Sequence, residues 1–295
     1  MPQSEMEGNE PGATGSVPLT DCHAHLDHVA ARLGAVALQT VLSAYGEAWG
    51  AAAPADRKEK CPFILDIGTE PGDLAPRLGR YGAYPFLRFS TGLWPGRTAL
   101  ERPGEALAAL EKDAASESCS ALGECGLDYH HMEAPPGQQI ALFEAQVEIA
   151  MKRRLPLIVH SRDAFADTLS VVSKAGMSIP IIIHCFGYGE AEAGKFLESG
   201  CMLSFAGNVT YKNSDSLRRA LAIVPAENLL VETDSPYMNP MPRRGRPTTP
   251  LDIIRTIEAA AAVKNMTIRE LSHIVHANAI RIFSGKSDRS GEELS

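Results

Sequence analysis

The sequence predicts an α/β protein in which eight parallel strands close into a (β/α)8 barrel. Short apolar runs alternate with helical patterns between residues 19 and 283. The strand-like runs number eight, and five of them end in a histidine or a carboxylate. Barrel enzymes place their catalytic groups at the carboxyl ends of the strands, so the chemistry agrees with the architecture. A doubly wound open sheet is the alternative, but it would gather its ligands at one switch point.

The strands are predicted from their apolar runs. They cover residues 19–25, 63–68, 86–92, 120–124, 155–160, 179–184, 201–205 and 229–234. Because helical patterns separate them, right-handed crossovers are expected to make neighbouring strands parallel.

The helices are predicted from apolar residues three and four positions apart. The longest pattern has Ile140, Phe143, Val147 and Met151 at such spacings. Pro103 suits the first turn of another helix. The predicted helices cover residues 30–49, 74–80, 103–116, 136–154, 164–174, 190–198, 214–223, 250–264 and 267–283.

Length and composition predict one large domain with a tail at each end. The chain has 295 residues, of which 44% are hydrophobic, and α/β barrels of this length often form a single domain. Residues 19–284 are assigned to that domain. Residues 1–18 are rich in Gly, Glu and Pro and are predicted to be a disordered tail. Residues 285–295 form a polar C-terminal tail, and residues 51–60 a surface loop or helix end.

Charge and cysteine content narrow the class of protein. A net charge of −8 argues against a generally basic surface for nucleic acid, so a substrate phosphate must be met locally. The six cysteines are scattered without a CxxC pair, and no signal-like apolar stretch stands near the start. No run approaches the roughly 18 apolar residues of a membrane span. These features predict a cytoplasmic protein.

Six residues at five strand ends are candidate metal ligands. His23 and His25 are two positions apart, so a strand would direct both imidazoles to one side. A polar loop after a strand is the alternative for this pair alone. Four later strands end in a further candidate ligand, which favours metal binding. The six candidates are His23, His25, Glu124, His160, His184 and Asp234.

Four histidines and two carboxylates indicate a catalytic site for two divalent ions. This donor set suits zinc, manganese, nickel or iron, with magnesium also open, and it lacks the cysteines of a closed structural zinc site. Six ligands exceed the need of one open metal, so two metals about 3.5–4 Å apart are expected, with Glu124 shared between them. Such a pair lowers the pKa of a bound water. Asp234 is the candidate general base.

Sequence motifs in unbroken order carry a family resemblance. They are HAHLD at residues 23–27, GECGLDY at 123–129, HSRDA at 160–164, HCF at 184–186, LLVETDSPY at 229–237 and the closing N-A-x-x-x-F at 278–283. On these residues the chain resembles the TatD family of metal-dependent hydrolases, within the amidohydrolase-like TIM barrels.

The resemblance implies a binuclear site and a nuclease activity. One metal would be held by His23, His25, Glu124 and Asp234, and the other by Glu124, His160 and His184. Members of the family are described as DNases that often trim from the 3′ end, so a 3′–5′ exonuclease acting on DNA is the leading interpretation. Some relatives remove D-amino acids from tRNA, and such a deacylase is the alternative. A binding scaffold without activity would require lost ligands, and none is lost. The oligomeric state stays open.

Substrate contacts are predicted at three places. The chain reads GLWPG at residues 92–96 where the family has a G-x-H-P-H element, so Trp94 is a candidate to stack on a base; packing against its own loop is equally open. Arg162 could bind a phosphate or form a structural ion pair. Arg243, Arg244 and Arg246 are a candidate landing site for a nucleic acid backbone, with a solvated loop as the alternative. His130 and His131 are assigned no metal.

Overall fold

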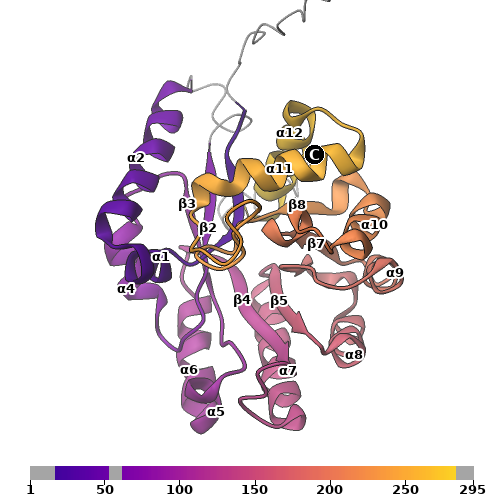
Figure 1. The fold of residues 1–295 in the computed structure, drawn as a ribbon. Coiled ribbons are helices and arrows are strands. Elements are labelled where there is room, and N and C mark those ends of the chain that lie inside the picture. The colour runs from indigo at the N-terminus through magenta and orange to yellow at the C-terminus, as the bar shows by residue number, and fades with distance from the viewer. Residues whose placement is uncertain (1–16, 53–61, 284–295) are drawn as a thin grey trace, which may run out of the picture.

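The computed structural model describes residues 17–52 and 62–283. Eight parallel strands form one sheet in the order of the sequence, and helices surround it (Figure 1). The strands are β1 (Thr20–Ala24), β2 (Phe63–Asp66), β3 (Leu87–Thr91), β4 (Cys119–Asp128), β5 (Leu157–Arg162), β6 (Ile181–Ile183), β7 (Met202–Phe205) and β8 (Leu229–Val231). The predicted barrel is confirmed.

Helices join successive strands on the outside of the barrel. The α-helices are α1 (Leu26–Leu33), α2 (Ala35–Ala51), α4 (Leu74–Tyr81), α5 (Arg97–Glu101), α6 (Pro103–Ala114), α7 (Pro136–Arg153), α8 (Phe165–Ala175), α9 (Glu190–Glu198), α10 (Asp215–Ile223), α11 (Ile253–Lys264) and α12 (Ile268–Phe283). Short 3-10 helices are η2 (Gly176–Ser178), η3 (Gly207–Thr210), η4 (Ala226–Asn228) and η5 (Pro250–Asp252). In the part of the chain that the structure describes, no helix is both long and apolar enough to cross a membrane.

The single helix predicted over residues 30–49 is wrong. The structure has α1 and α2, separated at Gly34, whose φ of 87° lies outside the helical region and suits glycine. Helix α1 also begins earlier, at Leu26, directly after His25. The short helix α5 was not predicted, and β4 continues past the predicted end at Glu124 to Asp128.

Contacts between β1 and the segment after β8 bring the two ends of the sheet together. Ala24 pairs in parallel with Ser235, and the Asp234 backbone N–H donates to the His23 carbonyl over 2.9 Å. The buried Asp21 carboxylate accepts hydrogen bonds from the backbone N–H and the hydroxyl of Thr233, at 2.9 and 2.5 Å. Burial raises the pKa of Asp21 to about 7. These bonds place the candidate ligands of β1 beside those that follow β8.

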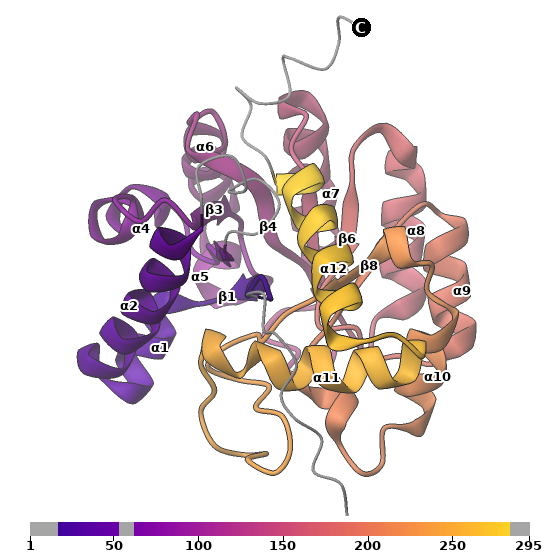
Figure 2. The same cartoon turned by 90° about the horizontal axis from the view of Figure 1, so that it is seen from above.

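A separate apolar cluster fills the interior of the barrel. It combines residues from most of the strands, including Leu65, Ile158, Ile182 and Leu230. Ile282 and Phe283 of α12 pack against it, and α12 lies across the end of the barrel where the strands begin (Figure 2). His160, His184 and Glu232 are each two residues after a member of this cluster, so the alternation of a strand directs them to the same interior at its other end.

The predicted tails lie almost entirely outside the described residues, as do residues 53–60 of the loop or helix end predicted over residues 51–60; Ala51 is the last residue of α2. Only residues 17 and 18 of the N-terminal tail are described, and the Pro18 carbonyl accepts a hydrogen bond from the Ser272 hydroxyl over 2.7 Å.

Replacing Gly126 with alanine is expected to lower the free energy of unfolding by about 3 kcal/mol or more. Gly126 has a φ of 133°, and a Cβ there would lie 2.0 Å from the His160 carbonyl oxygen on the paired strand β5. Denaturant unfolding of Gly126→Ala measures the loss. Gly194→Ala in α9 is the control, because its added Cβ meets no described atom within 4 Å. Equal stability of the two variants would contradict the expectation.

Candidate metal centre

The six predicted ligands converge at the carboxyl ends of the strands. His23 and His25 come from the end of β1, Glu124 and His160 lie within β4 and β5, and His184 and Asp234 follow β6 and β8. All six are buried except His160, which is partly exposed. Parallel strands end at the same rim of the barrel, which is why residues from distant parts of the chain meet there.

Three of the candidates form a first group. The Nε2 atoms of His23 and His25 lie 3.2 Å apart, and His25 Nε2 is 3.5 Å from Asp234 Oδ1. One ligand atom from each of these three residues lies within 4.8 Å of the others. Glu124 Oε2 lies 3.4 Å from His23 Nε2 and 3.5 Å from His25 Nε2.

The other oxygen of Glu124 belongs to a second group. Glu124 Oε1 lies 2.9 Å from His160 Nδ1 and 3.0 Å from His184 Nε2. These three residues also have ligand atoms within 4.8 Å of one another. The carboxylate of Glu124 therefore stands between the two groups and presents one oxygen to each.

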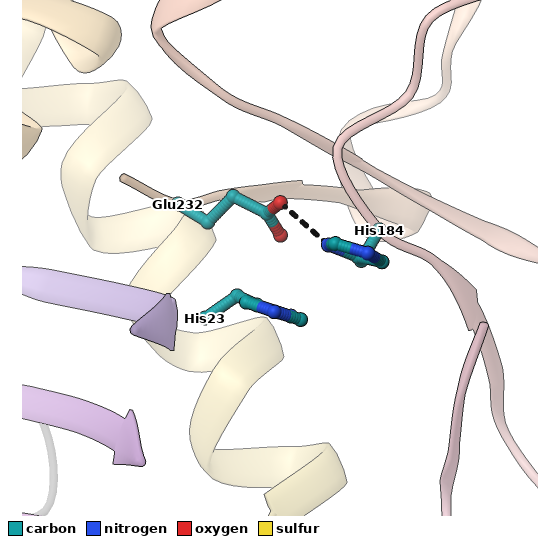
Figure 3. A group of neighbouring side chains, drawn as sticks. All are labelled: His23, His184 and Glu232. Carbon is teal, nitrogen blue, oxygen red and sulfur yellow. Dashed lines mark hydrogen bonds and ion pairs between the residues drawn. The ribbon is translucent and has the colours of Figure 1, made fainter. Parts of the chain in front are cut away.

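Two further carboxylates, missed at the sequence level, orient the histidines of the second group. Asp128 Oδ2 is 3.0 Å from His160 Nε2, and Glu232 Oε1 is 3.2 Å from His184 Nδ1 (Figure 3). Each bond occupies the ring nitrogen that does not face Glu124, so it fixes which nitrogen is free for a metal. Glu232 is two positions before Asp234. Residues two apart in a strand face the same side, so this spacing could have identified Glu232 as part of the centre.

Glu232 also lies next to the first group. The rings of His23 and His184 stack, with centroids 3.9 Å apart and planes 8° from parallel. Ligand atoms of His23, His184 and Glu232 lie within 4.8 Å of one another (Figure 3). The Cys185 backbone N–H donates to Glu232 over 2.7 Å, and the Ser204 hydroxyl donates to its other oxygen. A buried carboxylate is thereby held against one histidine of each group.

The buried carboxylates and histidines of the centre shift one another's pKa values. Burial by itself raises the pKa of Glu124, but the His184 charge and the surrounding histidine hydrogen bonds outweigh it and hold that pKa well below its usual value. Burial lowers the pKa of His184, yet Glu124 and Glu232 raise it well above the ordinary value. A proton on His184 thus supplies positive charge that a bound cation would otherwise supply, so cation binding is expected to release protons.

The donor set fits divalent metal ions. Imidazole nitrogens and carboxylate oxygens gather in largely buried groups, and no thiolate takes part among the described groups. Such mixed nitrogen and oxygen sites bind first-row divalent metals and leave positions open for water and substrate.

Trp94 and Arg162 lie at the rim of the centre. The half-buried Trp94 ring stands edge-on to His160, with centroids 5.9 Å apart, and also packs against Gly96 of its own loop. Arg162 is exposed at the end of β5, and within the described residues no carboxylate pairs with it. Arg162 lies near Cys185, the residue that follows His184. Burial raises the pKa of the Cys185 thiol, and the positive charge of Arg162 opposes that rise.

The three predicted loop arginines are exposed and only loosely held. Arg243 lies 3.6 Å from a carboxylate oxygen of Asp252, and the Arg244 guanidinium lies 4.5 Å from the ring centroid of Tyr211. Arg246 is exposed in the same turn. The structure thus places exposed positive charge on the segment that follows Asp234.

Comparison with known proteins agrees with this geometry. Residues 20–284 match the family model described as TatD related DNase. The uncharacterized metal-dependent hydrolase YcfH of Escherichia coli (strain K12) is 38% identical over 175 residues, which cover 59% of this chain and 66%, a little under two thirds, of YcfH. The uncharacterized metal-dependent hydrolase YabD of Bacillus subtilis (strain 168) is 32% identical over 228 residues, covering 77% of this chain and 89% of YabD.

Solved structures share the fold. The TatD homologue YJJV of Escherichia coli superposes with a TM-score of 0.74 at 22% identity, covering 90% of this chain and 97% of that one. A TatD family hydrolase from Entamoeba histolytica gives the same TM-score and coverage at 20% identity. With its family model matched along the whole barrel, the chain belongs to the TatD family of metal-dependent hydrolases.

Proposed function

We propose that this protein is a two-metal deoxyribonuclease that hydrolyses phosphodiester bonds of DNA, trimming single strands from the 3′ end. The observation that carries the proposal is the position of Glu124, whose two carboxylate oxygens face two separate ligand groups. A bridging carboxylate of this kind is typical of centres that hold two metals. The description of the matching family as TatD related DNase supports DNA as the substrate.

The chain's own residues have distinct roles in this proposal. One cation would be held by His23, His25 and Asp234. The other would be held by His160 and His184, and Glu124 would bind both cations. Two divalent cations, when bound, would activate a water molecule and neutralise charge on the phosphate. The hydrogen bond from His25 and the charges of His23 and His184 outweigh burial and lower the pKa of Asp234, so its carboxylate is ionised and can accept the proton of the attacking water.

Recognition of DNA would come from the rim. Arg162, with no carboxylate partner among the described residues, can bind a phosphate with two donors. Trp94 beside His160 can stack on a base of a single strand. An acidic protein needs such local contacts, because a net charge of −8 repels a polyanion within a Debye length of roughly 8 Å at physiological salt.

Replacing Arg243, Arg244 and Arg246 with alanine is expected to raise KM for single-stranded DNA and to flatten its salt dependence. Each lost phosphate contact should reduce the slope of log affinity against log salt by up to about 0.7. Initial rates across a salt series provide the measurement. Turnover of a small phosphodiester should hardly change, because that substrate cannot reach the loop.

A matched variant with three other positive charges removed controls for net charge. Arg102, Lys152 and Lys174 form exposed ion pairs on the outer helices and loops, away from the ligand residues. Their replacement by alanine should leave the slope close to that of the wild type. Equal slopes for both triple variants would show that the loop does not contact the DNA.

The proposed function is tested by incubating metal-loaded protein with 3′-labelled and 5′-labelled single-stranded DNA, and separately with D-aminoacyl-tRNA. Stepwise loss of nucleotides from the 3′ end supports the proposal. Deacylation of the tRNA without DNA cleavage would replace it with the alternative, an amide or ester hydrolase that uses the same centre. The cytoplasmic location inferred from the sequence is likewise a proposal.

A further inference from the structure

The loop after β4 carries two adjacent histidines with different surroundings. Both side chains are 51% exposed. His130 Nδ1 lies 3.2 Å from Asp163, an exposed carboxylate, whereas His131 Nδ1 lies 2.9 Å from Asp128 Oδ2, which is buried. The two side chains are therefore alike in exposure, but the His131 side chain bonds a buried carboxylate and the His130 side chain an exposed one.

Asp128 ties His131 to the metal centre. The oxygen that bonds His131 is the one that lies 3.0 Å from His160 Nε2. The other oxygen, Oδ1, accepts the backbone N–H groups of His130 and His131 at 3.0 and 2.7 Å. A carboxylate with this many bonds holds both the loop and the imidazole in one place, and the pKa of Asp128 lies well below its usual value because these hydrogen bonds outweigh burial.

The second ring nitrogen of His131, Nε2, has no hydrogen-bond partner among the described residues, and its side chain is half exposed. Since Nδ1 is bonded to Asp128, Nε2 lies on the opposite edge of the ring from that carboxylate. The ring stands edge-on to Trp94, with centroids 6.3 Å apart, and Trp94 in turn stands edge-on to His160. His131, Trp94 and the ligand His160 thus lie together on one side of the centre, with the imidazole of His131 half exposed.

We propose that His131 is a catalytic residue that protonates the leaving group of the phosphodiester. This inference rests on the proposed deoxyribonuclease function. The attacking water forms a new P–O bond and gives its proton to Asp234. The P–O bond to the departing sugar breaks, and its oxygen takes the proton of His131 Nε2. Asp128 orients the imidazole through Nδ1, as the carboxylate does in other Asp–His pairs.

The titratable groups around His131 are few. Asp128 of β4 faces Nδ1, and the same carboxylate separates His131 from His160 of β5. His130 packs edge-to-face on His131, with centroids 5.1 Å apart, and carries Asp163 on its own Nδ1. No lysine or arginine is paired with either histidine among the described residues.

The nature of the leaving group tests this role. Replacing His131 with alanine should lower kcat on single-stranded DNA by about 10²-fold or more, because an alkoxide is a poor leaving group without a proton. The same variant should hydrolyse bis(4-nitrophenyl) phosphate within a few-fold of the wild type, since nitrophenolate leaves unprotonated. His131→Gln, which keeps hydrogen bonding but cannot deliver a proton, should behave like His131→Ala. His130→Ala is the matched control and should behave like the wild type on both substrates.

Two measurements other than turnover accompany these assays. The metal content of His131→Ala and its Kd for a phosphorothioate oligonucleotide should equal those of the wild type, because the residue is proposed to act in bond breaking. Recovery of DNA cleavage in His131→Gln, or equal losses on both substrates, would overturn the inference and assign His131 a structural role. Failure of the wild-type protein to cleave DNA would instead contradict the proposed function, so the two failures are distinguishable.

Discussion

Asp234→Asn is expected to lower kcat on single-stranded DNA by about 10²-fold or more while changing KM little. The ionised carboxylate of Asp234 is the proposed acceptor of the proton from the attacking water, and an amide cannot accept it. Its Oδ1 lies 3.5 Å from His25 Nε2, and the residue is a member of the first ligand group as well as the proposed base. Steady-state kinetics with saturating metal measures the change.

Metal content must be determined on the same Asp234→Asn sample, because loss of a ligand also lowers turnover. Asp163→Asn is the control: Asp163 is an exposed carboxylate on the loop after β5 that pairs with His130. That variant should retain wild-type kcat. A rate for Asp234→Asn within a few-fold of the wild type, with full metal content, would exclude Asp234 as the base.

The second large effect is expected for Glu124→Gln. Wild-type protein reconstituted with excess metal should bind close to two ions per chain, and the variant should bind both at least 10-fold more weakly. The reason is geometric: one oxygen of Glu124 faces His23 and His25, and the other faces His160 and His184. The substitution also removes the negative charge that the four histidines surround. Elemental analysis and competition with a chelator give stoichiometry and affinity.

Glu105→Gln serves as the control for this experiment. Glu105 is an exposed residue of α6 that pairs with Arg102, and it should keep wild-type metal binding. A wild-type stoichiometry near one, with that ion bound equally well by Glu124→Gln, would show that Glu124 does not bridge two metals. The proposed two-metal mechanism would then have to be replaced by one that uses a single ion.

Much of the fold and of the ligand set could be predicted from local patterns. Apolar runs alternating with helical patterns indicate parallel strands, and parallel strands end at one rim. The position of His160 or His184 directly after such a run therefore placed it near Glu124 without knowledge of any contact. The prediction of a single helix over residues 30–49 failed because the backbone conformation of one residue, Gly34, ends α1 and starts α2. Its positive φ is not visible in the helical pattern.

The sequence by itself determined the barrel, the family and which side chains gather at the strand ends, because these depend on periodicities and motifs along the chain. Only the tertiary structure decided which atoms meet. The division of the Glu124 oxygens between two groups, the bond from Asp128 to both His160 and His131, and the position of Glu232 against His184 depend on the register and twist of neighbouring strands. Hydrogen bonds form over about 3 Å, a precision that spacing in the sequence does not carry.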